Sequence, residues 1–175
     1  MPRHVLTGAP GSGKTAVLRR LETAGFAVVE EAATDVIALQ QALGVEEPWQ
    51  APAFIERIVE LQHRRQLRAG DGITFFDRSP VCTLALSRFL GVDPPPELLA
   101  ELDRIRVERV YEPAVFFVRN QGFVRPTAAR RITFEESLAF ERVHEQAYRE
   151  AGFAIVDVPA GPLEARAATI YDAVT

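Results

Sequence analysis

The stretch Gly8-Ala9-Pro10-Gly11-Ser12-Gly13-Lys14-Thr15 decides the fold, because it matches the phosphate-binding pattern G-x-x-x-x-G-K-S/T in full. Its glycines permit backbone angles that other residues resist, so successive amides can point inward and hold phosphate oxygens. Lys14 is expected to reach the β- and γ-phosphates, and the Thr15 hydroxyl is expected to bind Mg²⁺. We therefore predict that Gly8 to Ala16 hold a purine nucleoside triphosphate together with Mg²⁺.

The basic residues and the flanking sequence support this interpretation. Of the 20 lysines and arginines, only Lys14 is a lysine, and it falls where a phosphate cradle needs an ammonium group. A guanidinium is not equivalent in so tight a space. The apolar run Val5 to Thr7 precedes the motif and a helical pattern follows it, which is the strand–loop–helix context that the motif requires.

Short apolar runs alternate with longer helical patterns along the chain. We predict strands over 5–7, 26–29, 73–76, 114–118 and 153–158, and helices over 14–24, 32–43, 51–68, 80–90, 97–110, 133–150 and from 162 onward. Gly25 and Gly91 are expected helix stops, Ser79-Pro80 a helix start, and Thr133 to Glu136 a capping box. This alternation predicts an α/β fold with a five-stranded, mainly parallel sheet in a three-layer sandwich, and a site at the carboxyl ends of the strands.

The bulk composition fits one domain over 1–175. With 175 residues, 47% hydrophobic and 25% charged, the chain falls outside the disordered and collagen-like classes. Its net charge of −4 offers no general attraction for nucleic acid or an acidic membrane. No signal peptide or membrane span is visible, and the one cysteine, Cys82, can form no internal disulfide. We expect a cytoplasmic protein in which Cys82 is a buried small hydrophobe.

A carboxylate and a guanidinium follow the third predicted strand. Asp77 ends a buried strand expected beside the first one, so its carboxylate should face the Mg²⁺. Arg78 is placed to bind the acceptor or the γ-phosphate; the alternative is an ion pair with Asp77, Glu30 or Glu31.

Two carboxylates, Glu30 and Glu31, end the second predicted strand. One of them could accept a proton from a substrate hydroxyl or grip a sugar, or the pair could cap the next helix. Neighbouring residues of a strand face opposite sides, so we expect only one to point inward.

Arginines gather in the polar segment 119–133, which we interpret as a lid. Arg119 closes the fourth strand and could stack on the base of the nucleotide. Arg125, Arg130 and Arg131 could close over the developing charge of a phosphoryl group, or form a solvated basic loop.

Trp49 and the histidines carry weaker signals. Trp49 is either a packing anchor or a wall of an acceptor pocket. His4, His63 and His144 have no zinc-binding spacing.

Several segments in this order resemble a known family. GAPGSGKT, VVEEAATDVI, FFDRSP, FFVRN and the tail from RRITFEES to GFAIVDVPAGPLEARA are similar to the small AAA-type P-loop family related to the NadR nicotinamide riboside kinase domain and the TRPL translocation defect protein. The resemblance implies a nucleoside-monophosphate-kinase-like fold, with Asp77-Arg78 as its DR motif and Arg119 at the start of the lid. It also implies that the turn Pro159-Ala160-Gly161 passes along the adenine edge.

Two functions remain from these observations. The first is an ATP- and Mg²⁺-dependent kinase that phosphorylates a small nucleoside-like or other hydroxyl-bearing acceptor. The second is a nucleotide-binding switch module that hydrolyses ATP or GTP slowly. The carboxylate pair beside Arg78, which a pure binder does not need, favours the kinase. The absence of an N-K-x-D run favours ATP over GTP.

Overall fold

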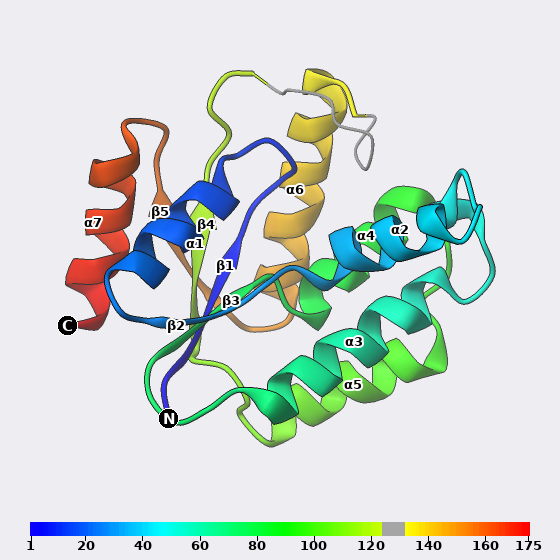
Figure 1. Cartoon of the computed structure of the whole chain (residues 1–175), viewed down its shortest axis with the longest axis horizontal. Helices are drawn as coiled ribbons and strands as arrows, with labels where there is room; N and C mark the ends of the chain where they lie inside the picture. Colours follow the sequence, from blue (N-terminus) through cyan, green and yellow to red (C-terminus); the bar gives the residue numbers. More distant parts are fainter. Residues whose placement is uncertain (124–131) are drawn as a thin grey trace.

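The computed structural model describes residues 1–123 and 132–175. At its centre is a sheet of five strands (Figure 1): β1 (Arg3–Thr7), β2 (Ala27–Val29), β3 (Thr74–Asp77), β4 (Ala114–Val118) and β5 (Ala154–Val158). The strand order is β2-β3-β1-β4-β5, and every neighbouring pair is parallel. The predicted parallel sheet is confirmed, and β1 is its central strand with β3 directly beside it.

Helices cover both faces of this sheet (Figure 1), which confirms the three-layer sandwich. One face carries α1 (Lys14–Thr23) and α7 (Leu163–Val174), and the other carries α4 (Pro80–Leu90) and α6 (Phe134–Glu150). A further group packs against α4: α2 (Ala32–Ala42), the 3₁₀ turn η1 (Pro48–Gln50), α3 (Phe54–Arg68) and α5 (Pro96–Val107).

Alternate residues of the strands fill two cores, one under each helical layer. Val5 and Phe76 belong to the core under α4 and α6. Leu6 and Phe75 belong to the core under α1 and α7. Because successive residues of a strand face opposite sides, a strand covered on both faces must be apolar throughout. This is why β4 and the apolar parts of β1 and β3 stood out in the sequence.

A third apolar cluster holds the outer helices together. Phe54, Ile58 and Leu98 are almost fully buried in it, and Trp49 packs against them. Trp49 is therefore a packing anchor, as one of its two interpretations proposed.

Two helices are shorter than predicted. α3 begins at Phe54 instead of residue 51, because η1 occupies 48–50 and Ala53 takes a left-handed φ of 62°. α5 ends at Val107 instead of residue 110, and Arg109 also has a positive φ, of 50°. Neither turn carries a glycine, so the sequence offered no local signal for it.

The two helix starts that were predicted from capping residues are confirmed. Ser79 caps α4 by accepting a hydrogen bond from the amide of Val81. Thr133 and Glu136 form both halves of the capping box that opens α6. Among the helices of the described residues, none is long and apolar enough to cross a membrane.

Candidate active site

The phosphate-binding loop (P-loop, residues 8–15) joins β1 to α1 at the carboxyl edge of the sheet. Gly8, Gly11 and Gly13 all have positive φ angles, of 142°, 83° and 77°. A Cβ atom on Gly8 would lie 2.4 Å from the carbonyl oxygen of Val118 in β4. The loop therefore requires glycine at this position for space as well as for its backbone angle.

The structure brings Lys14 and Asp77 together at the base of the P-loop. Leu6 of β1 pairs with Asp77 of β3, so the carboxylate lies on the face that α1 covers. The Lys14 Nζ is 2.5 Å from Asp77 Oδ1, and each side chain is only 3% exposed. Thr15, at the start of α1, is exposed to solvent. Three predicted site residues thus share one end of β1.

Arg78 points to the other side of the sheet, where Glu31 meets it. Its Nε lies 2.9 Å from Glu31 Oε1, with the two side chains 7% and 11% exposed. Burial works against the charge of Arg78, but Glu31 and Asp77 raise its pKa above the ordinary value. Glu30 instead pairs with Arg19 and is half exposed. Of the two predicted carboxylates, Glu31 is the one that faces the site.

His144 is a site residue that the sequence did not reveal. Its Nε2 lies 2.8 Å from Nη1 of Arg78, and its Nδ1 lies 2.9 Å from the carbonyl oxygen of Phe140. A guanidinium can only donate a hydrogen bond and a carbonyl oxygen can only accept one. Nδ1 therefore carries the proton and donates to the Phe140 carbonyl, and Nε2 accepts from Arg78. Full burial, and then the charge of Arg78, lower the pKa of His144 to about 3. The available signal was its position on the buried face of α6, four residues after Phe140.

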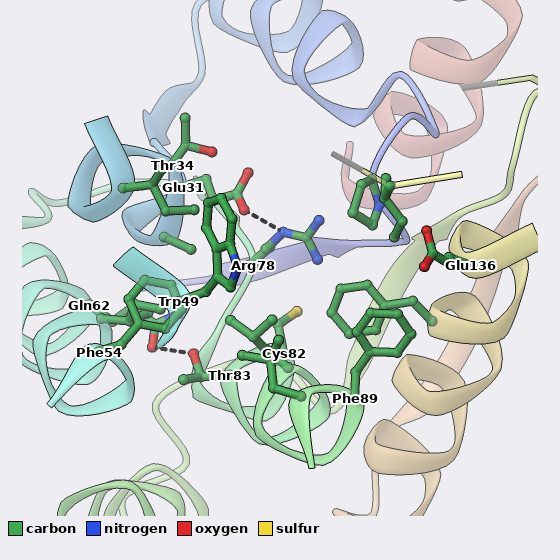
Figure 2. Close-up of a pocket in the computed structure, with 18 of the residues that line it drawn as sticks. Glu31, Thr34, Trp49, Phe54, Gln62, Arg78, Cys82, Thr83, Phe89 and Glu136 are labelled. Atoms are coloured by element: carbon green, nitrogen blue, oxygen red, sulfur yellow. Dashed lines mark hydrogen bonds and ion pairs between the residues drawn. The ribbon is translucent and has the colours of Figure 1, made fainter. Parts of the chain in front are cut away.

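A cavity of about 340 Å³ opens beside Glu31 and Arg78 (Figure 2). Trp49 and Phe54 border it from η1 and α3, and Phe89 borders it from α4. Trp49 therefore also fits its second interpretation, as a wall of a pocket. The polar lining includes Gln62, whose side-chain oxygen accepts a hydrogen bond of 3.0 Å from Thr83. The cavity is thus mainly apolar, with polar groups at a few points.

Buried hydrogen bonds hold the floor of this cavity. Tyr148 of α6 contacts Ser79 through its hydroxyl at 2.6 Å and the thiol of Cys82 at 3.0 Å. Cys82 also lies 3.1 Å from the hydroxyl of Thr7, at the end of β1. Cys82 is 3% exposed, so its predicted burial is confirmed, and it has polar contacts in addition.

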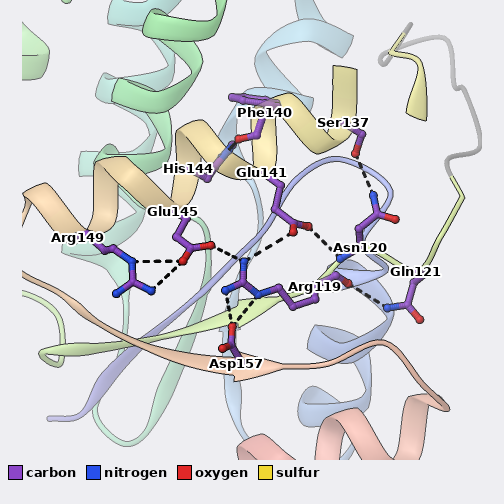
Figure 3. A network of polar contacts seen from close by, with 10 residues as sticks. All are labelled: Arg119, Asn120, Gln121, Ser137, Phe140, Glu141, His144, Glu145, Arg149 and Asp157. Atoms are coloured by element: carbon purple, nitrogen blue, oxygen red, sulfur yellow. Dashed lines mark hydrogen bonds and ion pairs between the residues drawn. The ribbon is translucent and has the colours of Figure 1, made fainter. Parts of the chain in front are cut away.

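Arg119 sits in a network of carboxylates instead of standing free (Figure 3). Its guanidinium lies 4.2 Å from the ring centre of Phe117 and pairs with Glu145 of α6 at 2.6 Å and with Asp157 of β5 at 2.5 Å. One face of the guanidinium is therefore already covered by an aromatic ring. The turn 159–161 follows β5 and is exposed at the same edge of the sheet. Arg125, Arg130 and Arg131 lie outside the described residues.

Two residues that the sequence analysis did not select hold the P-loop from behind. Ser137 of α6 donates a hydrogen bond of 2.8 Å to the carbonyl oxygen of Pro10. Arg166 of α7 donates one of 2.5 Å to the carbonyl oxygen of Ser12. These contacts join positions more than 120 residues apart, so no local pattern could indicate them.

A comparison with models of protein families matches residues 3–166 to an AAA domain. The chain belongs to the AAA domain family. The predicted resemblance to an AAA-type P-loop family is thereby confirmed. No curated protein sequence matches this AAA domain.

Solved structures share the fold of this AAA domain. A NadR protein in complex with NAD and AMP-PNP matches with a TM-score of 0.67 and 18% identity, over 99% of this chain and 50% of the NadR chain. A deoxyadenosine kinase from M. mycoides matches with a TM-score of 0.64 and 13% identity, over 98% and 97% of the two chains. A thymidylate kinase from Candida albicans matches with a TM-score of 0.58 and 12% identity, over 99% of this chain and 90% of the kinase chain. The AAA domain spans half the length of the NadR chain, and it has the predicted nucleoside-monophosphate-kinase-like P-loop fold.

The residues at the base of the P-loop fit the Mg²⁺ ion that such loops imply. Thr15 and Asp77 offer a hydroxyl and a carboxylate, and these hard oxygen donors suit Mg²⁺. The described residues of the AAA domain contain no cluster of three or more His, Cys, Asp or Glu that could hold a metal ion. Mg²⁺ commonly uses one or two protein ligands and takes the others from phosphates and water.

Proposed function

We propose that this AAA domain is an ATP- and Mg²⁺-dependent phosphotransferase that acts on a small, nucleoside-like acceptor bearing a hydroxyl group. The observation that carries this proposal is the position of the Glu31–Arg78 pair. The pair lines the cavity together with Pro10 of the P-loop. A carboxylate and a guanidinium thus stand between the place for the phosphates and a space large enough for an acceptor.

The charges of the site suit phosphoryl transfer. The acceptor hydroxyl attacks the γ-phosphorus of ATP, the bond from that phosphorus to the β–γ bridging oxygen breaks, and ADP leaves. Glu31 takes the hydroxyl proton as general base. Lys14 and Arg78 stabilise the negative charge on the phosphoryl oxygens. Thr15 and Asp77 would hold a bound Mg²⁺, which would supply neutralisation of the charge on the β- and γ-phosphates.

The lining of the cavity supports a ring-bearing acceptor. Trp49, Phe54, Phe89 and Phe140 offer aromatic surface, against which a planar ring can stack. The side-chain oxygen of Gln62 accepts from Thr83, and within residues 1–123 and 132–175 its amide N–H groups have no partner, so they can donate to a ligand. The solved structures with this fold include a NadR protein in complex with NR, a deoxyadenosine kinase and a thymidylate kinase. Their names support an acceptor of the nucleoside or nucleotide type.

The test is ADP release by the purified protein with ATP and Mg²⁺, alone and with a panel of nucleosides, nucleotides, nicotinamide riboside and sugars. We expect one acceptor class to raise the rate many-fold. Lys14→Ala should lower the acceptor-dependent rate by about a hundredfold or more, because the ammonium meets the charge of the transition state. Asp77→Asn should also remove the effect of the acceptor.

A matched pair of variants tests the role of Glu31. Glu31→Gln should lower kcat by about a hundredfold, within the usual range for a general base. Glu30→Gln, one residue away but turned toward Arg19, should stay within about twofold of the wild type, since exposed ion pairs contribute little. Slow ADP release that no acceptor changes, together with tight nucleotide binding, would contradict the kinase and favour a switch module.

A further inference from the structure

Arg166 lies behind the P-loop as a buried cation. It belongs to α7, which packs against α1, and it is only 5% exposed. Its Nη2 donates to the carbonyl oxygen of Ser12, and its Nη1 would lie 2.8 Å from a Cβ atom on Gly13. The guanidinium therefore lies directly against the backbone from which α1 begins.

This guanidinium has no compensating carboxylate within residues 1–123 and 132–175. Its Nε is buried and has no hydrogen-bond partner in that part of the chain. The carboxylate nearest to it in the sequence of α7, that of Glu164, pairs instead with Arg20 of α1, at 3.0 Å. Burial lowers the pKa of Arg166, although an arginine stays charged at any physiological pH. A buried charge without a partner is unfavourable for the folded protein.

The surroundings of Arg166 add further positive potential. The amino end of a helix carries a partial positive charge, and Arg166 lies against the amino end of α1. Lys14, the other buried cation of the loop, is already matched by Asp77 at 2.5 Å. Among the described residues, the loop region thus holds one buried cation more than it has anions to match.

We propose that Arg166 is a positioning residue for nucleotide binding, whose unmatched charge raises the affinity of the P-loop for the polyphosphate chain. It acts through the backbone of Ser12 and Gly13 and through its electric field, without touching the phosphates. The several negative charges of a nucleoside triphosphate, bound across the loop from this buried guanidinium, would compensate it. The folded protein gives up stability without ligand and recovers it when the triphosphate binds.

Arg166→Gln tests this, because glutamine can still donate to the Ser12 carbonyl but carries no charge. The affinity for ATP and for ADP is measured by calorimetry without an acceptor, so the outcome does not depend on phosphoryl transfer. We expect the Kd for ATP to rise about tenfold or more, and the Kd for ADP to rise less. We also expect the melting temperature of the nucleotide-free variant to equal or exceed that of the wild type.

Two controls separate the charge from other effects. Arg166→Lys keeps the charge and should bind ATP within a few-fold of the wild type. Arg20→Gln removes an arginine from the same pair of helices, but an exposed one that is already paired, and should leave the affinity unchanged. An unchanged Kd for ATP in Arg166→Gln would overturn the proposal. So would a lower melting temperature of its nucleotide-free form, since that would make Arg166 a structural brace.

Discussion

His144 illustrates how burial fixes the charge of a single residue. It is fully enclosed, with Arg78 on one side of its ring and the Phe140 carbonyl on the other. A proton on Nε2 would face a guanidinium and would break the hydrogen bond from Arg78. The histidine therefore stays neutral and acts as a fixed acceptor that, with Glu31, orients Arg78 from two directions.

The first prediction concerns stability at low pH. The pKa of His144 is about 3 in the folded protein against 6.5 for an unperturbed histidine, so between these values the unfolded chain binds a proton that the folded protein does not. Stability should therefore fall as the pH drops below about 6.5, by up to about 1.4 kcal/mol per pH unit. Urea unfolding at several pH values, for the wild type and for His144→Gln, measures this contribution as the difference between the two slopes.

Carboxylates also titrate in this range, but they are common to both proteins and cancel in that difference. The second role of His144 is to accept a hydrogen bond from Arg78, and a comparison of two variants tests it. Glutamine in His144→Gln can still accept this hydrogen bond. Leucine in His144→Leu cannot, and this variant should lower kcat more than it changes the KM for ATP. If the pH profiles of stability for wild type and His144→Gln were parallel, His144 would bind its proton equally well in the folded and unfolded states, which would contradict the prediction.

At Gly8, a single added carbon atom should destabilise the folded protein. In Gly8→Ala the new Cβ would meet the Val118 carbonyl oxygen at 2.4 Å. We expect a loss of roughly 2–4 kcal/mol in the free energy of unfolding, from the clash and the backbone strain together. Chemical denaturation measures it. Gly152→Ala is the control, since Gly152 also has a positive φ, of 84°, but has open space around it; its loss should be about 1 kcal/mol.

The site could be predicted from sequence only where its residues follow a local pattern. The P-loop and Asp77 could be selected as candidates because the loop carries a full motif directly after β1 and Asp77 is the last residue of the apolar strand β3. His144 and Arg166 were missed because their partners, Arg78 and Ser12, lie 66 and 154 positions away. Glu30 and Glu31 could not be told apart from the sequence, because both lie in the connection between β2 and α2, and only the fold places Glu31 against Arg78.

At the scale of elements, α6 is the piece that joins the P-loop to the far edge of the sheet. Ser137 in its first turns holds the Pro10 carbonyl, while Glu145 two turns later binds Arg119 between β4 and β5 (Figure 3). The two contacts lie on one helix, so a displacement of α6 would change both the loop and the strand ends.

The ion pairs of Arg119 with Glu145 and Asp157 should contribute measurably to the stability of the contact between α6 and the strands β4 and β5. Arg119→Met keeps most of the contact with Phe117 but removes the pairs with Glu145 and Asp157. We expect it to lower the free energy of unfolding by about 1–2 kcal/mol, a modest value because Arg119 is 25% exposed and its partner Asp157 is 59% exposed. Arg149→Met is the matched control, as Arg149 also pairs with Glu145 but is 62% exposed. Equal losses in the two variants would show that solvent screens the Arg119 network as well.

Element types followed from the sequence more closely than element limits did. The capping box at Thr133 and the Ser79-Pro80 start depend on residues that bond within their own turn, and both are confirmed. The start of α3 depends on a left-handed alanine at position 53. Alanine has no preference for that angle, so the local sequence could not indicate it.

At the scale of the whole molecule, the P-loop is attached to every layer. Gly8 lies against the Val118 carbonyl of β4, Pro10 is held by Ser137 of α6, and Ser12 by Arg166 of α7. The parallel sheet with helices on both faces was predictable from the alternation of patterns. These attachments were not, because they depend on the strand order β2-β3-β1-β4-β5, which places both helical layers around the end of β1.

Because of these attachments, nucleotide binding should stabilise the molecule as one unit. A ligand that binds only the folded protein adds about 2.7 kcal/mol at a concentration of one hundred times its Kd. For a chain of 175 residues, this corresponds to a rise in melting temperature of roughly 5–10 °C. Calorimetry with a non-hydrolysable ATP analogue and Mg²⁺ should show one sharper transition at higher temperature.

Hydrogen exchange should slow in α6 and α7 as well as in α1, since Ser137 and Arg166 transmit the constraint to both layers. Protection confined to α1 and the P-loop would show that the loop moves independently of the helices that hold it.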